Sequence, residues 1–177
     1  VEGDSDELVV QRAYMDSHDG RLPMQDGVEV ISVANSAQRF LQLAGVISQP
    51  VVVLTDNDGD PEKRRRQYGA YCLLCDGPAP NGVRIAVSFP GRCLPYRGSI
   101  KDYSYNTLEP ELLEANGLEK VGVVLGGSFD DRDAALRHMK SQKTECAYKF
   151  FLAEEEIVWP EYITSAIGFI DETLRRG

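Results

Sequence analysis

The feature that most constrains the fold is a run of four apolar residues, three of them β-branched, at Val51–Leu54. Pro50 precedes this run, and an acidic turn that contains Asp56 and Asp58 follows it directly. β-branched residues favour strands, and a strand without polar alternation is typical of a parallel sheet that is covered on both faces. Parallel strands need crossover connections, which are usually helices, so the run predicts a layered α/β fold.

Helical and strand patterns alternate along the rest of the sequence. Helices are predicted at residues 4–17, 36–44, 61–75, 130–140, 144–152 and 160–175, and further strands at residues 28–33 and 83–89. Residues 121–125 fit a strand by propensity or a helix by their flanks, and periodicity does not decide between the two. The predicted fold class is therefore α/β, with a parallel sheet flanked by helices, an irregular insertion at about residues 61–104 and a helical C-terminal region.

Length and charge restrict the function. The 177 residues carry 28 acidic against 19 basic side chains, with a net charge of −9, and suffice for one domain. This charge argues against nucleic-acid binding through bulk positive charge, although metal ions can supply positive charge locally. No apolar run approaches the roughly 18 residues of a membrane-spanning helix. Four cysteines without a signal peptide predict a reducing compartment, and so a cytoplasmic location.

Two acidic turns carry the chemistry that the sequence predicts. The first contains Glu2 and Asp6, and the second, after the buried strand, contains Asp56 and Asp58. Side chains that follow a strand of an open α/β sheet project into a cleft at its carboxyl end. Clustered carboxylates repel one another unless a cation offsets their charge, and Mg²⁺ prefers oxygen ligands of this kind. A divalent metal is the simplest reason for this density of acids.

Other interpretations of these acids stay open. Acids are favoured near helix N-termini, so Asp4 and Glu7 are expected to cap the first helix, and Asp60 the helix that begins at Pro61. An EF-hand calcium loop would use the three aspartates of the second turn. It fails in detail, because Pro61 stands where that loop needs Gly, and Gln67 where it needs Glu.

A phosphatase is a further alternative. In haloacid-dehalogenase-like phosphatases an apolar strand ends in Asp-x-Asp, so Asp56 would be the nucleophile and Asp58 the acid/base. Asp130 and Asp131 would then correspond to a later acidic pair. Asp60 departs from this pattern, which has Thr or Val at its position.

The two turns together resemble the TOPRIM domain of topoisomerases, primases and some nucleases, which has Glu after its first strand and Asp-x-Asp after a later one. The resemblance is more specific to the overcoming-lysogenisation-defect (OLD) nuclease family. It rests on residues 1–8 (VEGDSDEL), 55–60 (TDNDGD), 106–110 (NTLEP), 142–147 (QKTECA) and 159–163 (WPEYI). It implies a TOPRIM-like catalytic core at residues 1–110, a helical part of the same nuclease region at 111–177, and a helix at 121–125.

OLD-family proteins join an ABC-type ATPase to a C-terminal TOPRIM nuclease, and the sequence contains no P-loop. The resemblance therefore implies the nuclease half of such a protein, acting on DNA, with the ATPase domain as its partner in the full-length chain. Because the sequence begins with Val1 and not with Met, we expect a fragment of a longer chain. The resemblance places the strand that leads into Glu2 upstream, and it allows a homodimer formed through the missing part.

The resemblance also assigns roles in a two-metal endonuclease that uses Mg²⁺ or Mn²⁺, with Ca²⁺ able to occupy the site in crystals. Glu2 is also counted as catalytic. The implied ligands and catalytic cation are Glu2 and Asp6 for one ion, Asp56 and Asp58 for the other or as bridges, Glu109 and Thr107 to complete the second site, and Lys143 near the scissile phosphate. Lys149 and Lys140 are the runners-up for that cation.

The basic run Lys63, Arg64, Arg65 and Arg66 follows the second acidic turn. It is either a solvated helix face or a phosphate-binding surface beside the cleft. A catalytically inactive TOPRIM scaffold also stays open, although the intact set of acids argues against it. A zinc site built on Cys72, Cys75 and Cys93 is not favoured, because three thiols do not fill four positions.

Overall fold

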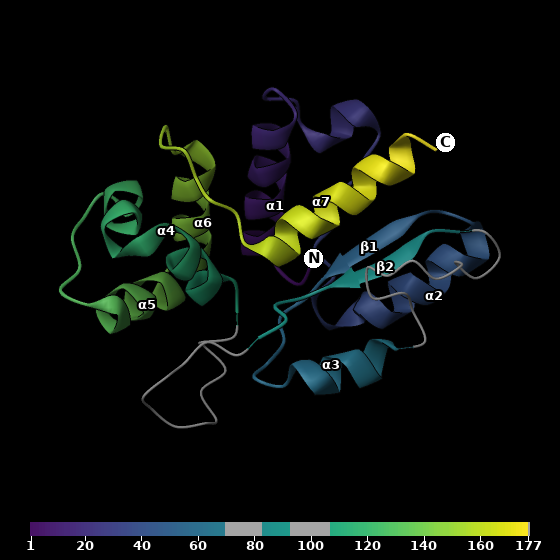
Figure 1. Cartoon of the computed structure of the whole chain (residues 1–177), viewed down its shortest axis with the longest axis horizontal. Helices are drawn as coiled ribbons and strands as arrows, with labels where there is room; N and C mark the ends of the chain where they lie inside the picture. Colours follow the sequence, from purple (N-terminus) through teal and green to yellow (C-terminus); the bar gives the residue numbers. More distant parts are fainter. Residues whose placement is uncertain (70–82, 93–106, 177) are drawn as a thin grey trace.

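The computed structural model describes residues 1–69, 83–92 and 107–176, and it has an α/β fold of TOPRIM-like type. Within these residues, two strands form one parallel sheet; of the seven α-helices, some pack on the sheet and the others form a helical part beside it (Figure 1). None of the helices in the described ranges is both long and apolar enough to span a bilayer. The possible zinc ligands Cys72, Cys75 and Cys93 lie outside the described residues.

The sheet consists of β1 (Val51–Leu54) and β2 (Ile85–Ser88), which pair in parallel from Val51 opposite Ile85 to Leu54 opposite Ser88. Both strands were predicted from the sequence, and both predictions are confirmed. Helix α3 (Pro61–Tyr68) follows β1 directly. Pro61 is its first residue, and the Asp60 side chain accepts a hydrogen bond from the Lys63 backbone N–H at 2.8 Å, so the predicted cap is confirmed.

Successive residues of β1 face opposite sides of the sheet, as strand geometry requires. Val53 belongs to the smaller apolar cluster, which α2 (Ala37–Ile47) and Tyr68 of α3 build with one face of the sheet. Leu54 belongs to the larger apolar cluster, which includes α1 (Asp4–Ser17) and α7 (Glu161–Leu174). The sheet is therefore covered on both faces, with α7 on one side and α2 on the other (Figure 1).

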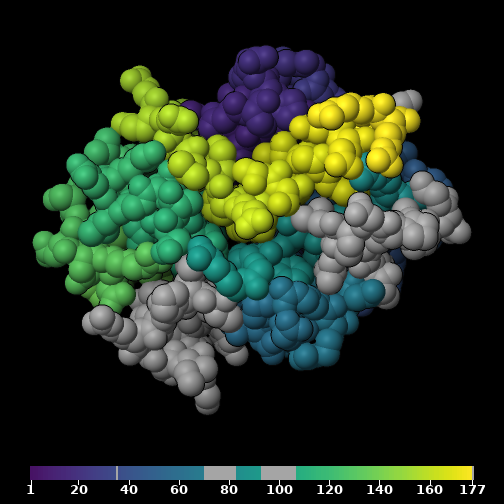
Figure 2. Space-filling view, viewed as in Figure 1, coloured from purple at the N-terminus to yellow at the C-terminus, as the bar shows by residue number. Residues whose placement is uncertain are grey.

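The larger apolar cluster continues into three further helices, α4 (Leu108–Leu125), α5 (Arg132–Ser141) and α6 (Lys143–Leu152). Helix α6 packs along α1, and α4 packs on both α5 and α6. Figure 2 shows α7 (yellow) between this helical part (green) and the sheet part (teal and blue). The predicted C-terminal helices are confirmed, and the expected boundary at residues 110 and 111 lies inside α4.

One predicted strand is wrong. Residues 28–33 form no strand, and the short 3-10 helices η1 (Pro23–Asp26) and η2 (Ala34–Ser36) flank them. Val1 pairs with this segment: its amine donates to the Ile31 carbonyl at 2.9 Å, and the Val33 N–H donates to the Val1 carbonyl at 2.9 Å. β-Propensity reflects how a side chain fits a pleated surface, and no strand within residues 1–69, 83–92 and 107–176 pairs with this segment to provide one.

Two further predictions concern helices. Residues 121–125 are helical, which confirms the expectation from the family resemblance against strand propensity. Gly117 kinks α4 about one turn before this segment, and its φ of +77° is a conformation that favours glycine. Helix α3 ends at Tyr68, and the rest of its predicted range to residue 75 lies almost wholly outside the described residues.

Candidate metal centre

The acidic turn after β1 is fixed in place by a buried amide. Asn57 is 1% exposed, and its Nδ2 donates to the Pro90 carbonyl at 2.9 Å and to the Arg92 carbonyl at 2.7 Å. Its Oδ1 accepts from the Gly59 N–H at 2.8 Å, which closes the local turn. The backbone of Asp58 is left-handed, with φ +52°, a conformation that Asp tolerates better than most residues. The turn is therefore anchored on the segment that follows β2.

A cleft of about 190 Å³ opens beside this turn. It collects residues from five places in the chain: the segment before α1, the first turn of α1, the turn after β1, the N-terminus of α4 and the N-terminus of α6. Its lining consists of Glu2, Gly3, Ser5, Asp6, Asp56, Leu108, Glu109 and Lys143. The structure thus brings together four of the predicted acidic ligands and the predicted catalytic lysine, although they are up to 141 positions apart in the sequence.

Three of the four carboxylates have hydrogen-bond donors. The Thr55 hydroxyl donates to Glu2. The Gly3 N–H donates to Asp6 at 2.9 Å, so α1 begins with Gly3 as its cap residue, and the predicted Asp4–Glu7 capping box is wrong. Glu109 accepts from the Thr107 hydroxyl at 2.6 Å, and its other oxygen lies 3.3 Å from the Lys143 ammonium.

Asp56 is the exception among these acids. The hydrogen bonds that it makes within the described residues involve its backbone carbonyl, which accepts from Thr55 and from Arg64, and none involves its carboxylate. Burial, together with the negative charges of Asp6, Glu2 and Glu109, raises the pKa of Asp56 to about 9. The cleft therefore contains a carboxyl group that is desolvated and has no donor within the described residues, which is a position suited to a cation.

The neighbouring groups respond to the same crowding. Burial, and then the charges of Glu2 and Glu109, raise the pKa of Asp6 to about 6, although the Gly3 N–H favours its charged form. Burial disfavours the Lys143 ammonium, but the charge and hydrogen bond of Glu109 outweigh this effect and raise the lysine pKa. The cleft is thus an electronegative site that holds a cationic side chain at its edge.

The other predicted site residues lie outside the lining of the cleft. Asp58 forms an ion pair with Arg64, and Thr107 contributes its hydroxyl to Glu109. Arg65 pairs with Glu62, while Lys63 and Arg66 are exposed on α3. Lys149 donates to the Leu125 carbonyl at 2.9 Å, so the structure places Lys143, and not this runner-up, at the cleft.

Two residues of the site were missed by sequence reasoning: Thr55 binds Glu2, and Asn57 anchors the turn. Arg64 was expected only as part of a basic run on a solvated or phosphate-binding helix face, and the structure turns it inward. For Thr55 and Asn57 the available signal was their place between the acids at the end of a buried strand. The direction of the Arg64 side chain had no such signal, because four successive basic residues do not show which face of the helix packs inward.

Two alternatives for the acids do not agree with this geometry. Asp131 caps α5 by accepting from the Ala134 N–H at 2.7 Å, and neither it nor Asp130 lines the cleft, as a haloacid-dehalogenase-like site would require. An EF-hand would gather the three aspartates of one loop. Here Asp56 lines the cleft, Asp58 pairs with Arg64, and Asp60 caps α3.

The donor set fits a divalent ion in its chemistry, because four carboxylates line one cleft and one of them has no donor among the described residues. In the described ranges, however, no three His, Cys, Asp or Glu side chains stand at metal-ligand spacing. The cleft carboxylates of Glu2, Asp6 and Glu109 instead contact a hydroxyl, a backbone N–H group and a cationic side chain. Metal binding at this cleft would therefore require side chains to exchange these partners for the ion.

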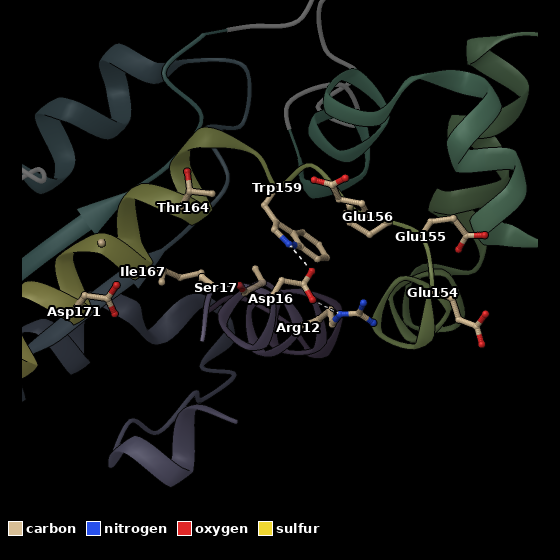
Figure 3. Close-up of a pocket in the computed structure, with 13 residues that line it drawn as sticks. Arg12, Asp16, Ser17, Glu154, Glu155, Glu156, Trp159, Thr164, Ile167 and Asp171 are labelled. Carbon is tan, nitrogen blue, oxygen red and sulfur yellow. Dashed lines mark hydrogen bonds and ion pairs between the residues drawn. The ribbon is translucent and has the colours of Figure 1, made fainter. Parts of the chain in front are cut away.

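A larger cavity of about 630 Å³ lies at the other end of α1, between that helix, α7 and residues 154–159 (Figure 3). Its polar groups bind one another: Arg12 donates to the Ala153 carbonyl at 2.8 Å, and the Trp159 indole donates to Asp16 at 2.9 Å. Asp171 pairs with His18. The smaller acidic cleft is the better candidate for chemistry, because it gathers carboxylates whose pKa values are raised around a cationic side chain.

Comparison with known proteins agrees with this choice. Residues 1–58 match the family model described as "Overcoming lysogenization defect protein-like, TOPRIM domain", which confirms the resemblance over this part of the chain. The match includes Glu2, Asp6, Asp56 and Asp58. Searches of the curated proteins and of the solved structures found no match. A TOPRIM domain of this type is a metal-binding domain of the nuclease class, and the matched segment supplies most of the acids described above.

Proposed function

From this OLD-like TOPRIM domain we propose that the chain is a divalent-metal-dependent DNA endonuclease. The observation that carries the proposal is the convergence of Glu2, Asp6, Asp56 and Glu109 on one cleft. Asp56 adds the strongest single argument, because its carboxyl group is desolvated and has no donor among the described residues. The Lys143 ammonium offsets a charge on Asp56 in part, and a bound cation would offset it further.

When bound, Mg²⁺ or Mn²⁺ would supply an activated water and stabilise the charge that develops during phosphodiester hydrolysis, in two-metal fashion. Glu2 and Asp6 would hold one ion. Asp56 and Asp58 would hold the other, and Glu109 and, more weakly, Thr107 would complete its site. Thr55 orients Glu2 through its hydroxyl, and Asn57 keeps Asp56 at the cleft.

The remaining residues act on the substrate and on protons. Lys143 offers the scissile phosphate an ammonium group at the edge of the cleft, and Glu109 keeps that group charged. Asp56 retains a proton near neutral pH until a cation replaces it, because burial raises its pKa. Lys63 and Arg66, exposed on α3, contact phosphates of the DNA backbone beside the cleft. The proposal extends to a cytoplasmic protein with an ABC-type ATPase domain and a homodimeric assembly.

The test is conversion of supercoiled plasmid DNA to open-circular or linear forms. Wild type should cleave with Mg²⁺ or Mn²⁺ and stop when EDTA is added, and Asp56→Asn should not cleave under any of these conditions. A small phosphomonoester, p-nitrophenyl phosphate, serves as the parallel substrate. If wild type leaves DNA intact and hydrolyses the phosphomonoester, the enzyme is a phosphatase. If it acts on neither, the domain is an inactive scaffold.

A further inference from the structure

Arg64 differs from the rest of its basic run in the direction of its side chain. The side chain is only 14% exposed, and it turns from α3 toward the acidic turn. Its Nε donates to the Asp56 carbonyl at 2.9 Å, and its Nη2 pairs with the Asp58 carboxylate and lies 3.9 Å from Glu2 Oε1. One guanidinium group therefore contacts both acidic turns of the candidate metal centre.

Within the described residues, no three possible metal ligands lie at the spacing that an ion needs. The contacts of the acids give a reason for this. Two side-chain cations flank the acids from opposite ends: Lys143 lies at Glu109, and Arg64 lies between Asp58 and Glu2. Asp58 is turned to Arg64 and does not line the cleft. Internal cations thus occupy carboxylates that an ion would otherwise bind.

We propose that Arg64 is a positioning residue that holds Asp58, and draws Glu2, in the metal-free protein and releases Asp58 when an ion enters. This inference rests on the proposed function, because it concerns the same carboxylates. An ion bound at Asp58 would lie close to the Arg64 guanidinium, and the repulsion between the two cations makes them compete for this carboxylate. The competition makes Arg64 an internal substitute for the second ion.

The turn is built so that this exchange needs only side-chain movement. Asn57 fixes the backbone on either side through the Pro90 carbonyl and the Gly59 N–H. The Asp58 side chain itself is 46% exposed and can rotate into solvent. Arg64 keeps a second attachment, the bond from Nε to the Asp56 carbonyl, when its Nη2 gives up Asp58. The guanidinium therefore stays at the mouth of the site after the exchange.

Competition predicts a specific pair of changes in Arg64→Gln. Loss of the counter-charge leaves Asp58 and Glu2 uncompensated, so the metal-free protein should melt at a lower temperature. The same loss frees Asp58 and makes the site more negative, so the Mg²⁺ affinity should rise by about tenfold. Arg64→Lys keeps a positive charge but not the fork of donors, and it should fall between wild type and Arg64→Gln.

The measurement is Mg²⁺ titration of the protein without DNA, by calorimetry and by thermal melting. Arg132→Gln is the matched control, because it removes an ion pair of 2.6 Å with Glu114, which lies on α4 outside the lining of the cleft. The control should lower the melting temperature slightly and leave the Mg²⁺ affinity unchanged. If Arg64→Gln binds Mg²⁺ as wild type does, the pair is only structural and the inference is wrong.

Weaker binding by Arg64→Gln would also overturn the inference, since it would show that Arg64 places the ligands and does not compete for them. Arg64→Lys decides the question if Arg64→Gln does not fold. Failure of the proposed function has a different signature. In that case wild-type protein itself shows neither heat nor a change in melting temperature on Mg²⁺ addition, whatever residue stands at position 64.

Discussion

At the scale of single residues, substitution of Asp56 tests whether this acid is a metal ligand or has only a structural role. Asn has the shape of a protonated Asp, and the pKa of Asp56 is raised to about 9, mainly by burial. Asp56→Asn should therefore leave the metal-free stability near wild type at pH 7, within about 0.5 kcal/mol. It should abolish the stabilisation by saturating Mg²⁺, which for a site at 100-fold excess over Kd is about 2.7 kcal/mol. Thermal melting with and without Mg²⁺ measures both quantities.

Asp58→Asn is the natural comparison, since the same chemical change falls on a carboxylate that is already paired with Arg64. It should cost the metal-free protein up to about 1 kcal/mol, as exposed ion pairs do. If Asp56→Asn lost stability in the metal-free state and kept the wild-type response to Mg²⁺, Asp56 would be structural and the metal site would lie elsewhere.

The same carboxyl group predicts a pH dependence. Its pKa is about 9 in the folded state, against an ordinary value of 3.8, so between these values the folded protein holds a proton that the unfolded chain has released. Metal-free stability should therefore fall as pH rises from 6 to 9, by at most about 1.4 kcal/mol per pH unit for one group. Melting across this range should show a shallower slope in Asp56→Asn than in wild type, and equal slopes would contradict the assignment.

Lys143 should affect catalysis without acting as a ligand. Lys143→Met removes a positive charge at the edge of the cleft, so DNA cleavage should fall by about 100-fold or more. Mg²⁺ binding should not weaken, because the variant removes a cation that competes for Glu109. Lys149→Ala is the control: it loses a bond to the Leu125 carbonyl, costs about 1 kcal/mol of stability and keeps cleavage. The reverse result would exchange the roles of the two lysines.

At the scale of elements, the turn after β1 depends on one amide. Asn57→Ala would leave the carbonyls of Pro90 and Arg92 without their donor in a buried position. This should cost about 2–4 kcal/mol and displace Asp56, so the response to Mg²⁺ should be lost together with stability. Asn116→Ala removes a similar triple contact, to Leu112 and Val158, away from the cleft. That control should lose stability and keep the full response to Mg²⁺.

The sequence predicted elements well where the signal was local. The unbroken β-branched run gave β1, and Asp60 with Pro61 gave the start of α3. The strand prediction failed at residues 28–33. Within the described residues this segment has no partner strand, and its contacts to Val1 are two backbone hydrogen bonds. Residues 121–125 show the converse, because helical context overrides the propensity of their valines.

The candidate site was predictable in its acids and in Lys143, and not in the contacts of Arg64. Glu2, Asp6, Asp56 and Glu109 were expected from motif order, and they do line one cleft. The inward turn of Arg64 depends on how α3 docks beside the acidic turn, which no local pattern records. For the same reason we expected Asp58 and Asp56 to share one metal site. In the structure Asp56 lines the cleft, whereas Asp58 pairs with Arg64.

At the scale of the whole molecule, net charge governs how DNA can bind. With a net charge of −9, the protein repels a polyanion except where cations are concentrated. DNA affinity should therefore depend on divalent metal and on few phosphate contacts, which gives a shallow salt dependence. Replacing Lys63 and Arg66 together with Gln should reduce the slope of log K against log salt by up to about 2. An unchanged slope would place the phosphate contacts elsewhere.

The alternation of β1 between two apolar clusters has a mechanical consequence. Val53 is packed in the smaller apolar cluster with α2, and Leu54, the next residue, is packed in the larger apolar cluster with α7. Only Leu54 and Thr55 separate Val53 from Asp56. A displacement of α2 relative to α7 would therefore shear the strand at its last peptide units and move Asp56 against Glu109 and Lys143, which belong to helices of the larger cluster. A force applied to α2 would therefore change the spacing of the carboxylates, because the backbone of β1 connects the two directly.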